Sequence, residues 1–298
     1  MITNFLHAIT AQNIEVLHDE LLSRHTSFRI GGLARMMVVA RTMDDVLIVL
    51  QAAREQVETV KILGGGSNIL APDEGYPGVI LLPPSGDIRR VSDTVIEADC
   101  GVPKAALAVY ACREGLAGLE FAHGIPGTVG GGVYMNAGAY GGDMSQVVIS
   151  TTAVNSTGEV VVIDNAGHKF GNRTSMFKEN PGLIILSTRL RLTHGDPRKI
   201  RARMDDLMTQ RRDKQPLEYP SAGSVFKRPE GHFAGKLIED SGLKGYTIGG
   251  AQVSEKHAGF IINRGGATAA DVRCLIEHIQ ATVLRNYNIE LECELEIW

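Results

Sequence analysis

The sequence lacks most of the features that mark disulfide-rich, nucleic-acid-binding and membrane proteins. It has only 4 cysteines in 298 residues, and none of them form a C-x-x-C pair. Lys and Arg number 30 against 34 Asp and Glu, so the net charge of −4 has the wrong sign for binding nucleic acid or an anionic membrane. No apolar run approaches the roughly 20 residues of a membrane span. We therefore predict a soluble, folded, cytoplasmic protein in which any bound anion is held by a local site.

The cysteines and histidines also argue against metal sites and exported proteins. Cys100, Cys112, Cys274 and Cys293 all lie in apolar-patterned segments, and we predict reduced core residues. The 9 histidines form no H-E-x-x-H or similar ligand spacing, so no catalytic metal is expected. Residues 1–4 lack the charged-then-apolar layout of a signal peptide.

The length predicts two domains, and the apolar patterns predict that they contain both helices and strands. A chain of 298 residues holds about two domains at roughly 150 residues each. A strand is expected over 36–40, followed by a helix that Thr42 and Asp45 begin with a capping box, and by a second strand ending near 63. Residues 147–154 and 159–163 read as a hairpin, and 183–192 as another strand. A domain boundary is expected near 193–195.

Further helices and a terminal strand are predicted on both sides of this boundary. Pro103 suits the first position of a helix that ends at Gly115. Later helices are expected from Pro197 to before Pro216 and after Thr268. Residues 289–297 alternate strictly between apolar residues and glutamate, which predicts a half-buried strand with one acidic face.

What the sequence does contain is clustered glycine. The 34 glycines are about 11% of the chain, against a usual ~7%. One cluster is Gly64–Asn68, and the other places eight glycines in residues 124–142; neither has the Rossmann or P-loop pattern. Pro126 and Gly127 predict a turn, and Thr128 can cap a short helix that runs through about Asn136. The dipole of this helix and the free N–H groups at its start would face a pyrophosphate. The ordinary alternative is that these glycines serve only tight turns and close packing.

Read together, these motifs resemble a known family. Both clusters are similar to the flavin-binding fold of the vanillyl-alcohol-oxidase type, and within it to the UDP-N-acetylenolpyruvoylglucosamine reductases, of the compact type. Four further stretches resemble the same family's motifs in the same order over nearly the whole chain: residues 26–32, 173–177, 222–227 and 291–294.

The resemblance implies a fold, two domains and a reaction. It implies an α+β protein, with an FAD-binding domain of two α+β subdomains at residues 1–193 and an α+β substrate-binding domain at 194–298. NADPH would reduce bound FAD, and the enolpyruvyl ether of UDP-N-acetylglucosamine would then take a hydride at C3 and a proton at C2, giving UDP-N-acetylmuramate for peptidoglycan synthesis. The residues implied in FAD binding are Gly64, Gly65, Gly66, Ser67, Asn68, Gly124, Ile125, Pro126, Gly127, Thr128, Gly130, Gly131, Asn136, Gly138, Ala139 and Tyr140.

The resemblance also assigns catalytic residues. Arg173 matches the arginine that binds the substrate carboxylate, Ser224 the proton donor to C2, and Glu294 the glutamate that polarises the enolic intermediate. Lys214 is a candidate for binding the UDP diphosphate. By pattern alone each has an ordinary reading: solvated charges for Arg173 and the glutamate face, a turn hydroxyl for Ser224, and a helix C-terminal cation for Lys214.

Three departures from the family and two alternative functions remain. Asn172, His123 and Arg228 stand where the family usually has tyrosine, a small residue and asparagine. Relatives in the wider fold attach flavin through histidine, but we predict noncovalent FAD here. The alternatives are an FAD oxidase or dehydrogenase of the same fold acting on an alcohol or hydroxy acid, and a flavin-binding regulatory protein without turnover. The oligomeric state is left open.

Overall fold

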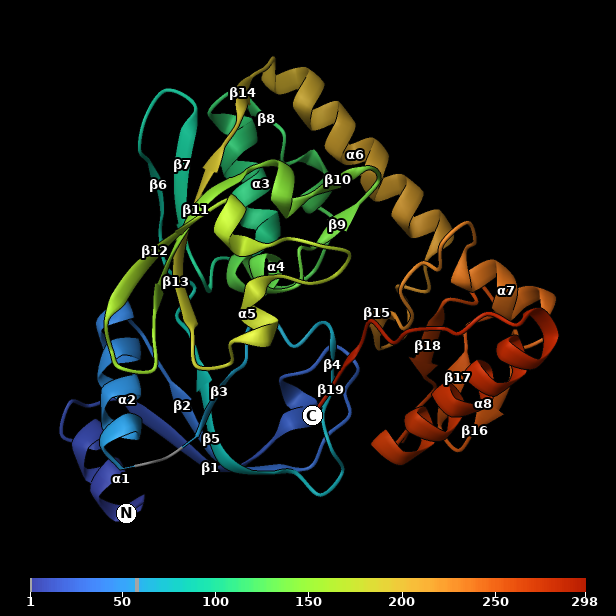
Figure 1. Ribbon diagram of the computed structural model, residues 1–298, viewed down its shortest axis with the longest axis horizontal. Helices are drawn as coiled ribbons and strands as arrows, with labels where there is room; N and C mark the ends of the chain where they lie inside the picture. The colour runs from blue at the N-terminus through green and yellow to red at the C-terminus, as the bar shows by residue number, and fades with distance from the viewer. Residues whose placement is uncertain (1, 57–58) are drawn as a thin grey trace. The chain divides into compact units, whose positions relative to one another are not determined.

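The chain folds into helices and mainly antiparallel sheets, as the predicted α+β class requires. The computed structural model describes residues 2–56 and 59–298 (Figure 1). The chain divides into two compact units. The first is Met1–His18, Met36–Gly65 and Gly78–Thr209, and the second is Asp19–Arg35, Gly66–Pro77 and Gln210–Trp298. A single cut after residue 193 therefore does not separate the units, and the functional assignment of the two predicted domains stays a prediction.

A five-stranded antiparallel sheet is the main sheet of the first unit (Figure 1). Its order is β12 (Val160–Asp164), β11 (Val148–Val154), β13 (Ile184–Arg191), β7 (Val95–Asp99) and β6 (Ile88–Arg90). The predicted hairpin and the strand after it are thus confirmed. The hairpin turns because the Asn155 side-chain oxygen accepts from the amides of Thr157 at 3.0 Å and Glu159 at 2.9 Å, and Gly158 has a φ of +87°.

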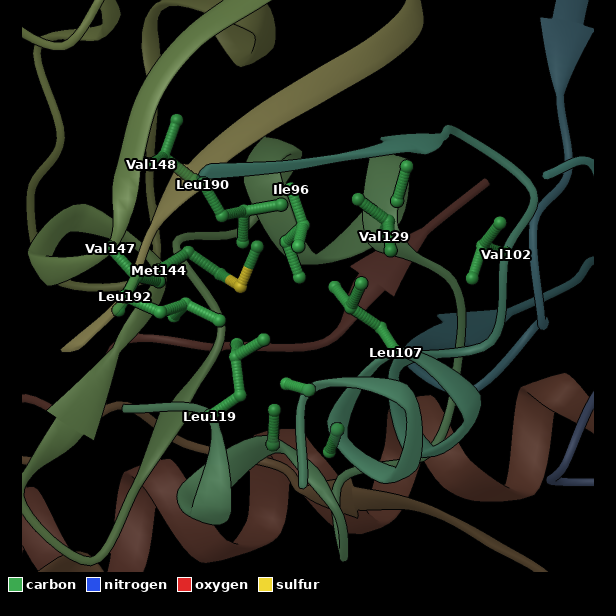
Figure 2. Packing of buried hydrophobic residues seen from close by; sticks show 14 of the residues in the cluster. Ile96, Val102, Leu107, Leu119, Val129, Met144, Val147, Val148, Leu190 and Leu192 are labelled. Carbon is green, nitrogen blue, oxygen red and sulfur yellow. The ribbon is translucent and has the colours of Figure 1, made fainter. Parts of the chain in front are cut away.

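Helices pack on this sheet to enclose an apolar core. They are α3 (Lys104–Arg113), α4 (Val129–Tyr134) and the first part of α6 (Pro197–Lys214). Figure 2 shows Met144, Ile96 and Leu190 pointing toward one another, with Leu107 and Val129 nearby. The predicted helix ends are confirmed at Gly115 and before Pro216, although Pro103 is the N-cap of α3 rather than its first residue.

A second sheet has the order β1 (Glu15–Leu21), β2 (Leu33–Val39), β5 (Tyr76–Leu82) and β3 (Val60–Ile62). Helix α2 (Met43–Glu55) follows β2 and begins with the predicted capping box, in which Asp45 N–H donates to the Thr42 hydroxyl at 3.1 Å. Helix α1 (Ile2–Thr10) packs on α2 through Phe5 and Ile9. The expected strand–helix–strand order is present, and β5 lies between β2 and β3.

The second unit has its own sheet and helices. Strands β15 (Ser221–Ser224), β18 (Phe260–Asn263), β17 (Ala251–Val253) and β16 (Thr247–Ile248) pair in this order, and α7 (Ala234–Asp240) and α8 (Ala269–Tyr287) contribute to the same apolar core. Helix α8 begins with a capping box between Thr268 and Asp271. The carboxylate of Asp73 also accepts from its first amides, at 2.7 and 3.0 Å, which ties the 66–77 segment to this unit.

Short elements complete the chain. The paired strands are β4 (Ile69–Leu70) with β19 (Glu296–Ile297), β8 (Leu116–Ala117) with β14 (Thr193–His194), and β9 (Gly138–Ala139) with β10 (Gly142–Asp143). The other helices are α5 (Met176–Glu179) and the 3-10 turns η1 (Leu22–Arg24), η2 (Glu120–Ala122), η3 (Met144–Gln146) and η4 (Ala166–His168). Over residues 2–56 and 59–298, no helix is long and apolar enough to cross a membrane.

The prediction of a continuous strand over 289–297 is wrong. Only Glu296–Ile297 forms a strand, and Cys293 makes one isolated bridge with Phe226. The ladder breaks because the amides of Glu294 and Leu295 both donate to the Val225 carbonyl, at 2.7 and 3.4 Å. The inward alternation fails at its end too, since Ile297 is 45% exposed.

The prediction that all four cysteines are core residues is also wrong. Cys100 and Cys112 are buried, Cys293 is half-buried and Cys274 is exposed on α8. All four are free thiols. A helix of 19 residues has a solvent face as well as a core face, and position 274 falls on the solvent face.

Candidate active site

The two glycine clusters meet within the first unit. A Cβ atom built on Gly65 would lie 2.7 Å from the Cα of Gly127, and one on Gly64 would lie 2.6 Å from the Thr128 hydroxyl oxygen. These distances are shorter than real Cβ contacts, so only glycine lets the two backbones approach so closely. Gly127 itself has a φ of +99°, which glycine tolerates and other residues do not. The close approach of the two backbones explains why both segments have glycine at these positions.

This meeting point carries amide groups that no protein acceptor uses. In the described part of the chain, the N–H groups of Gly64, Gly65, Gly127 and Thr128 donate to no backbone or side-chain acceptor. The carbonyl of Gly127 accepts from the Lys104 amide at 3.0 Å. Because a trans peptide points its N–H opposite to its C=O, the Thr128 N–H is directed away from α3. Unused amides grouped in this way bind anions.

The predicted contribution of the α4 N-terminus is wrong. Thr128 does cap this helix, since its hydroxyl accepts from Gly131 N–H at 3.3 Å. The amides of Val129 and Gly130, however, donate to the carbonyls of Val102 and Cys100, both at 2.8 Å. The first helical N–H groups are therefore satisfied inside the protein, and the amides left for an anion belong to the turn before the helix. The helix also ends at Tyr134, short of Asn136.

Lys104 is a residue of this site that the sequence analysis missed. It is 3% exposed, and its ammonium donates to the carbonyl of Thr128 at 3.3 Å while its amide holds Gly127. It thus orients both peptides of the turn. A signal was present in the sequence, because a lysine just after Pro103 at a helix N-terminus opposes the helix dipole and needs another reason to be there.

A neighbouring thiol is inert. Cys100 is buried against Gly130, whose Cβ position lies 2.9 Å from the Cys100 Cβ. Burial, with the nearby Asp99 charge adding to it, raises the pKa of Cys100 to about 12. The thiol stays protonated beside the turn and has no nucleophilic role.

Arg173 is held against the second half of the glycine-rich segment. It has a φ of +56°, a left-handed conformation that costs a non-glycine residue energy and is concentrated at functional sites. Its guanidinium donates to the carbonyl of Gly138 at 2.9 Å. The buried Asn136 side chain joins the same segments, because it donates to Gly171 O at 3.0 Å and accepts from Ser145 N at 2.9 Å. Asn136 is therefore committed to internal bonds through its side chain and also through its N–H, which donates to Val133 O at 3.2 Å.

The second unit brings together three other predicted segments. Glu294 N–H donates at 2.7 Å to the carbonyl of Val225, the residue that follows Ser224 in the sequence. The Asn68 side chain donates to Glu294 O at 3.0 Å, and the Asn68 carbonyl accepts from Glu296 N at 2.9 Å. Both Ser224 and Glu294 are half-buried. Residues far apart in the sequence are thus joined by their backbones into one group.

The turn at Gly66 closes this second group. Gly66 has a φ of +57°, and a Cβ there would lie 2.0 Å from the His25 carbonyl. Its own carbonyl accepts from Ser27 N at 3.0 Å, and the Ser27 hydroxyl donates to Ser221 O at 2.7 Å. The motif at residues 26–32 therefore joins the 66–68 turn to the strand that ends at Ser224.

The other predicted residues lie as follows. Ile125 N–H donates to Ala122 O at 3.1 Å, Pro126 is exposed, and Tyr140 is 38% exposed with a φ of +55°. Lys214 is exposed at the end of α6, where Lys256 rather than Lys214 donates to a late carbonyl, that of Arg212, at 2.6 Å. The predicted site residues thus fall mainly into two groups, one in each unit.

The first group fits the diphosphate of FAD on its own geometry. The unused amides of Gly64, Gly65, Gly127 and Thr128 lie where the two backbones approach each other, and a Cβ on Gly65 would lie 2.7 Å from the Gly127 Cα and force them apart. His123 Nδ1, next to Gly124, is buried without a partner, so this nitrogen is not exposed for a covalent bond to flavin.

Comparisons with known proteins extend these observations over the chain. The family profile described as "FAD binding domain" matches residues 34–164, and "UDP-N-acetylenolpyruvoylglucosamine reductase, C-terminal domain" matches 215–298. The curated UDP-N-acetylenolpyruvoylglucosamine reductase of Pediococcus pentosaceus is 45% identical over 284 residues, covering 95% of this chain and 94% of its own. That of Clostridium botulinum strain Hall is 46% identical over 286 residues, covering 96% of this chain and 93% of its own.

A solved structure agrees with the family models and with the curated relatives. The crystal structure of UDP-N-acetylenolpyruvylglucosamine reductase from Thermus caldophilus is 33% identical, matches with a TM-score of 0.82, and covers 96% of this chain and 98% of that one. The matches include the segments of Arg173, Ser224 and Glu294 as well as the glycine clusters. The fold resemblance stated from the motifs is confirmed, and the chain belongs to the UDP-N-acetylenolpyruvoylglucosamine reductase family.

Proposed function

We infer that this chain uses FAD and NADPH to reduce the enolpyruvyl ether of UDP-N-acetylglucosamine to UDP-N-acetylmuramate. The observation that carries the inference is that the relationship spans 95% of the chain, and does not stop at the FAD-binding residues 34–164. A relationship confined to those residues would support only a flavoprotein. The product is a peptidoglycan precursor, which places the protein in cell-wall synthesis, and we propose a cytoplasmic location.

FAD binding is assigned to the two glycine clusters. The amides of Gly64, Gly65, Gly127 and Thr128 hold the diphosphate, and Lys104 fixes the orientation of the Gly127–Thr128 turn. When bound, FAD accepts a hydride from NADPH and supplies it to C3 of the enolpyruvyl group.

Arg173 stabilises the negative charge that hydride addition creates. Hydride addition at C3 leaves negative charge on C2 and on the attached carboxylate, so a fixed cation there stabilises the transition state more than the ground state. The planar guanidinium suits a carboxylate because it donates two parallel hydrogen bonds. Its hydrogen bond to Gly138 and its left-handed backbone orient it before substrate arrives.

Ser224 and Glu294 complete the reaction at C2. The Ser224 hydroxyl donates its proton to C2, since an enolate carbon is basic enough to take a proton from a weak acid. Glu294 stabilises the enolic form of the substrate and interacts with the acid group as it develops. The backbone bond between Glu294 and Val225 fixes the spacing of the two residues. Lys214 is proposed to bind the diphosphate of the UDP-sugar.

The test is a spectroscopic titration of the purified holoenzyme under anaerobic conditions. NADPH is expected to bleach the visible flavin absorbance, and the enolpyruvyl sugar is then expected to restore it, with one UDP-N-acetylmuramate formed per flavin. An FAD oxidase of the same fold would bleach little with NADPH and more with an alcohol or hydroxy acid. Absorbance that stays bleached after the sugar is added would overturn the proposal, as would a protein that leaves NADPH unoxidised.

A further inference from the structure

His168 is a fully buried histidine in the first unit to which the mechanism gives no role. It is 0% exposed and lies in η4, on the chain between β12 and α5. Its Nδ1 lies 2.5 Å from the carbonyl oxygen of Asp164, and its Nε2 lies 2.8 Å from the hydroxyl of Thr151 on β11. Both ring nitrogens therefore have partners.

The partners fix which nitrogen carries the proton. A carbonyl oxygen only accepts, so Nδ1–H donates to Asp164 and the bare Nε2 accepts from the Thr151 hydroxyl. Thr151 in turn lies 3.3 Å from the hydroxyl of Thr188 on β13, and both threonines are 0% exposed. Thr188 then donates to Thr151. The ring is thus anchored to the central sheet by a directed chain of hydrogen bonds.

The free faces of the ring hold the ends of the Arg173 segment. Phe170 stacks on His168 with a centroid distance of 4.7 Å and an interplanar angle of 8°, and Phe177 lies against it at 5.9 Å and 57°. Phe170 lies within the segment 169–176 and Phe177 directly follows it, and Arg173 lies between them. Contacts on both sides of the segment therefore converge on one side chain.

The segment itself is strained and needs such support. Lys169 and Arg173 both have left-handed backbones, with φ values of +48° and +56°. Non-glycine residues keep this conformation only when their surroundings over-determine it. The bonds from Asn136 to Gly171 O and from the Ser175 hydroxyl to Tyr134 O, at 3.0 and 2.8 Å, support one side of the segment. His168 supports the other.

We propose that His168 is a positioning residue for Arg173: its hydrogen bonds to the sheet and its contacts with Phe170 and Phe177 keep the 169–176 segment in the conformation that binds the substrate carboxylate. His168 touches no reacting atom and acts through the segment. The catalytic part of this inference rests on the proposed role of Arg173, and the structural part does not.

The first measurement is hydrogen exchange by mass spectrometry on the FAD-loaded protein. His168→Leu removes both hydrogen bonds and the ring stack, and peptides covering 169–176 are expected to exchange at least about tenfold faster, while those covering β7 and β13 keep their rates. His168→Asn, whose amide nitrogen is as many bonds from the backbone as Nδ1, is expected to restore part of the protection. Unchanged exchange over 169–176 in His168→Leu would overturn the proposal.

Ser187→Ala is the matched control. Ser187 is buried on the same strand as Thr188, but its hydroxyl donates to Glu97 at 3.1 Å and is not part of the hydrogen-bond chain that ends at His168. We expect its effect to be confined to β7 and β13, with 169–176 at wild-type rates. If Ser187→Ala loosens 169–176 as much as His168→Leu does, the effect is general destabilisation and the proposal fails.

Half-reaction kinetics test the catalytic part. In His168→Leu we expect normal FAD content and normal flavin reduction by NADPH, but reoxidation by the enolpyruvyl sugar slowed about tenfold, since a small misplacement of a binding group is costly. Equal slowing of both half-reactions would overturn the positioning role. A wild-type protein that fails to reoxidise with the sugar would instead contradict the proposed function, and the hydrogen-exchange result would still decide the structural part.

Discussion

The Asn68 side chain donates to the backbone carbonyl of Glu294 at 3.0 Å, although the two residues are 226 positions apart in the sequence. The carbonyl of Asn68 also accepts from the next residue but one, Glu296, at 2.9 Å. These two bonds join the first glycine cluster to the C-terminal segment, and the bond from Glu294 to Val225 continues the connection to Ser224. Residues 66–68 of this cluster and the predicted proton-transfer residues Ser224 and Glu294 are therefore joined by hydrogen bonds within the second unit.

Replacing Ser224 is expected to separate the two half-reactions. Ser224→Ala should leave flavin reduction by NADPH unchanged and slow the reoxidation by the enolpyruvyl sugar by roughly 10²-fold or more, because it removes the general acid. Stopped-flow absorbance measures each half separately. Ser221→Ala, in the same strand, is the control and should keep both rates. Equal damage to both halves in Ser224→Ala would count against its role as proton donor.

Glu294 is expected to act in the same half-reaction. Glu294→Gln keeps the size of the side chain and all backbone bonds but removes the charge, so it should slow flavin reoxidation by about tenfold or more. The control is Glu292→Gln, because Glu292 is mostly exposed and pairs with Lys227. A Glu294→Gln enzyme with wild-type reoxidation would rule out a role for this carboxylate.

Gly65 is expected to be intolerant of a side chain. The Cβ of Gly65→Ala would lie 2.7 Å from the Cα of Gly127 and force the two turns apart. Losing one amide bond to the charged diphosphate costs about 1.5–3 kcal/mol, so FAD should bind at least about tenfold more weakly. Titration of the apo-protein by flavin fluorescence measures this. Gly182→Ala, whose Cβ would meet Ser156 at 3.3 Å in an exposed turn, should bind FAD normally. Full affinity in Gly65→Ala would contradict the placement of the diphosphate.

Buried His168 is expected to make the protein less stable in acid. Burial lowers the pKa of His168 below its usual 6.5, against smaller opposing contributions from the Asp164 and Asn165 backbone and the Asp164 charge. Below pH 6.5 the unfolded chain binds a proton at this residue and the folded chain does not, so the free energy of unfolding falls as the pH falls, by at most about 1.4 kcal/mol per pH unit.

Urea unfolding between pH 7.5 and 5.5 measures this slope. In His168→Phe the slope should be smaller, whatever the stability at neutral pH. His257, whose pKa burial also lowers, contributes a slope of the same sign in both proteins and therefore cancels in the comparison. An identical slope in the two proteins would show that His168 is not buried in its neutral form.

Local patterns predicted the elements well, because their determinants lie within a few residues. The capping box at Thr42 and the hairpin turn at Asn155 depend on side chains that bond to their own neighbourhood. The helix stop at Gly115 depends on a φ of +68°, which glycine adopts without strain. The fold as a whole was predicted from the resemblance of the motifs to a known family, not from these local patterns. Neither kind of pattern says which amide meets which carbonyl across the fold.

Those long-range pairings are what the sequence analysis missed. The N–H groups at the start of α4 are used by Val102 and Cys100, and the terminal strand is broken because two amides share the Val225 carbonyl. Lys104 and His168 gained their roles only through burial against segments distant in the sequence.

By itself, the sequence determined where the helices, turns and glycine clusters of this protein lie, since conformational preference and capping act over a few residues. Only the tertiary structure decided which backbone amides remain unused beside Gly127 and which side chains hold Arg173 in a left-handed conformation. The physical reason is that a hydrogen-bond donor bonds to whatever acceptor packing brings to it, and packing depends on the whole chain.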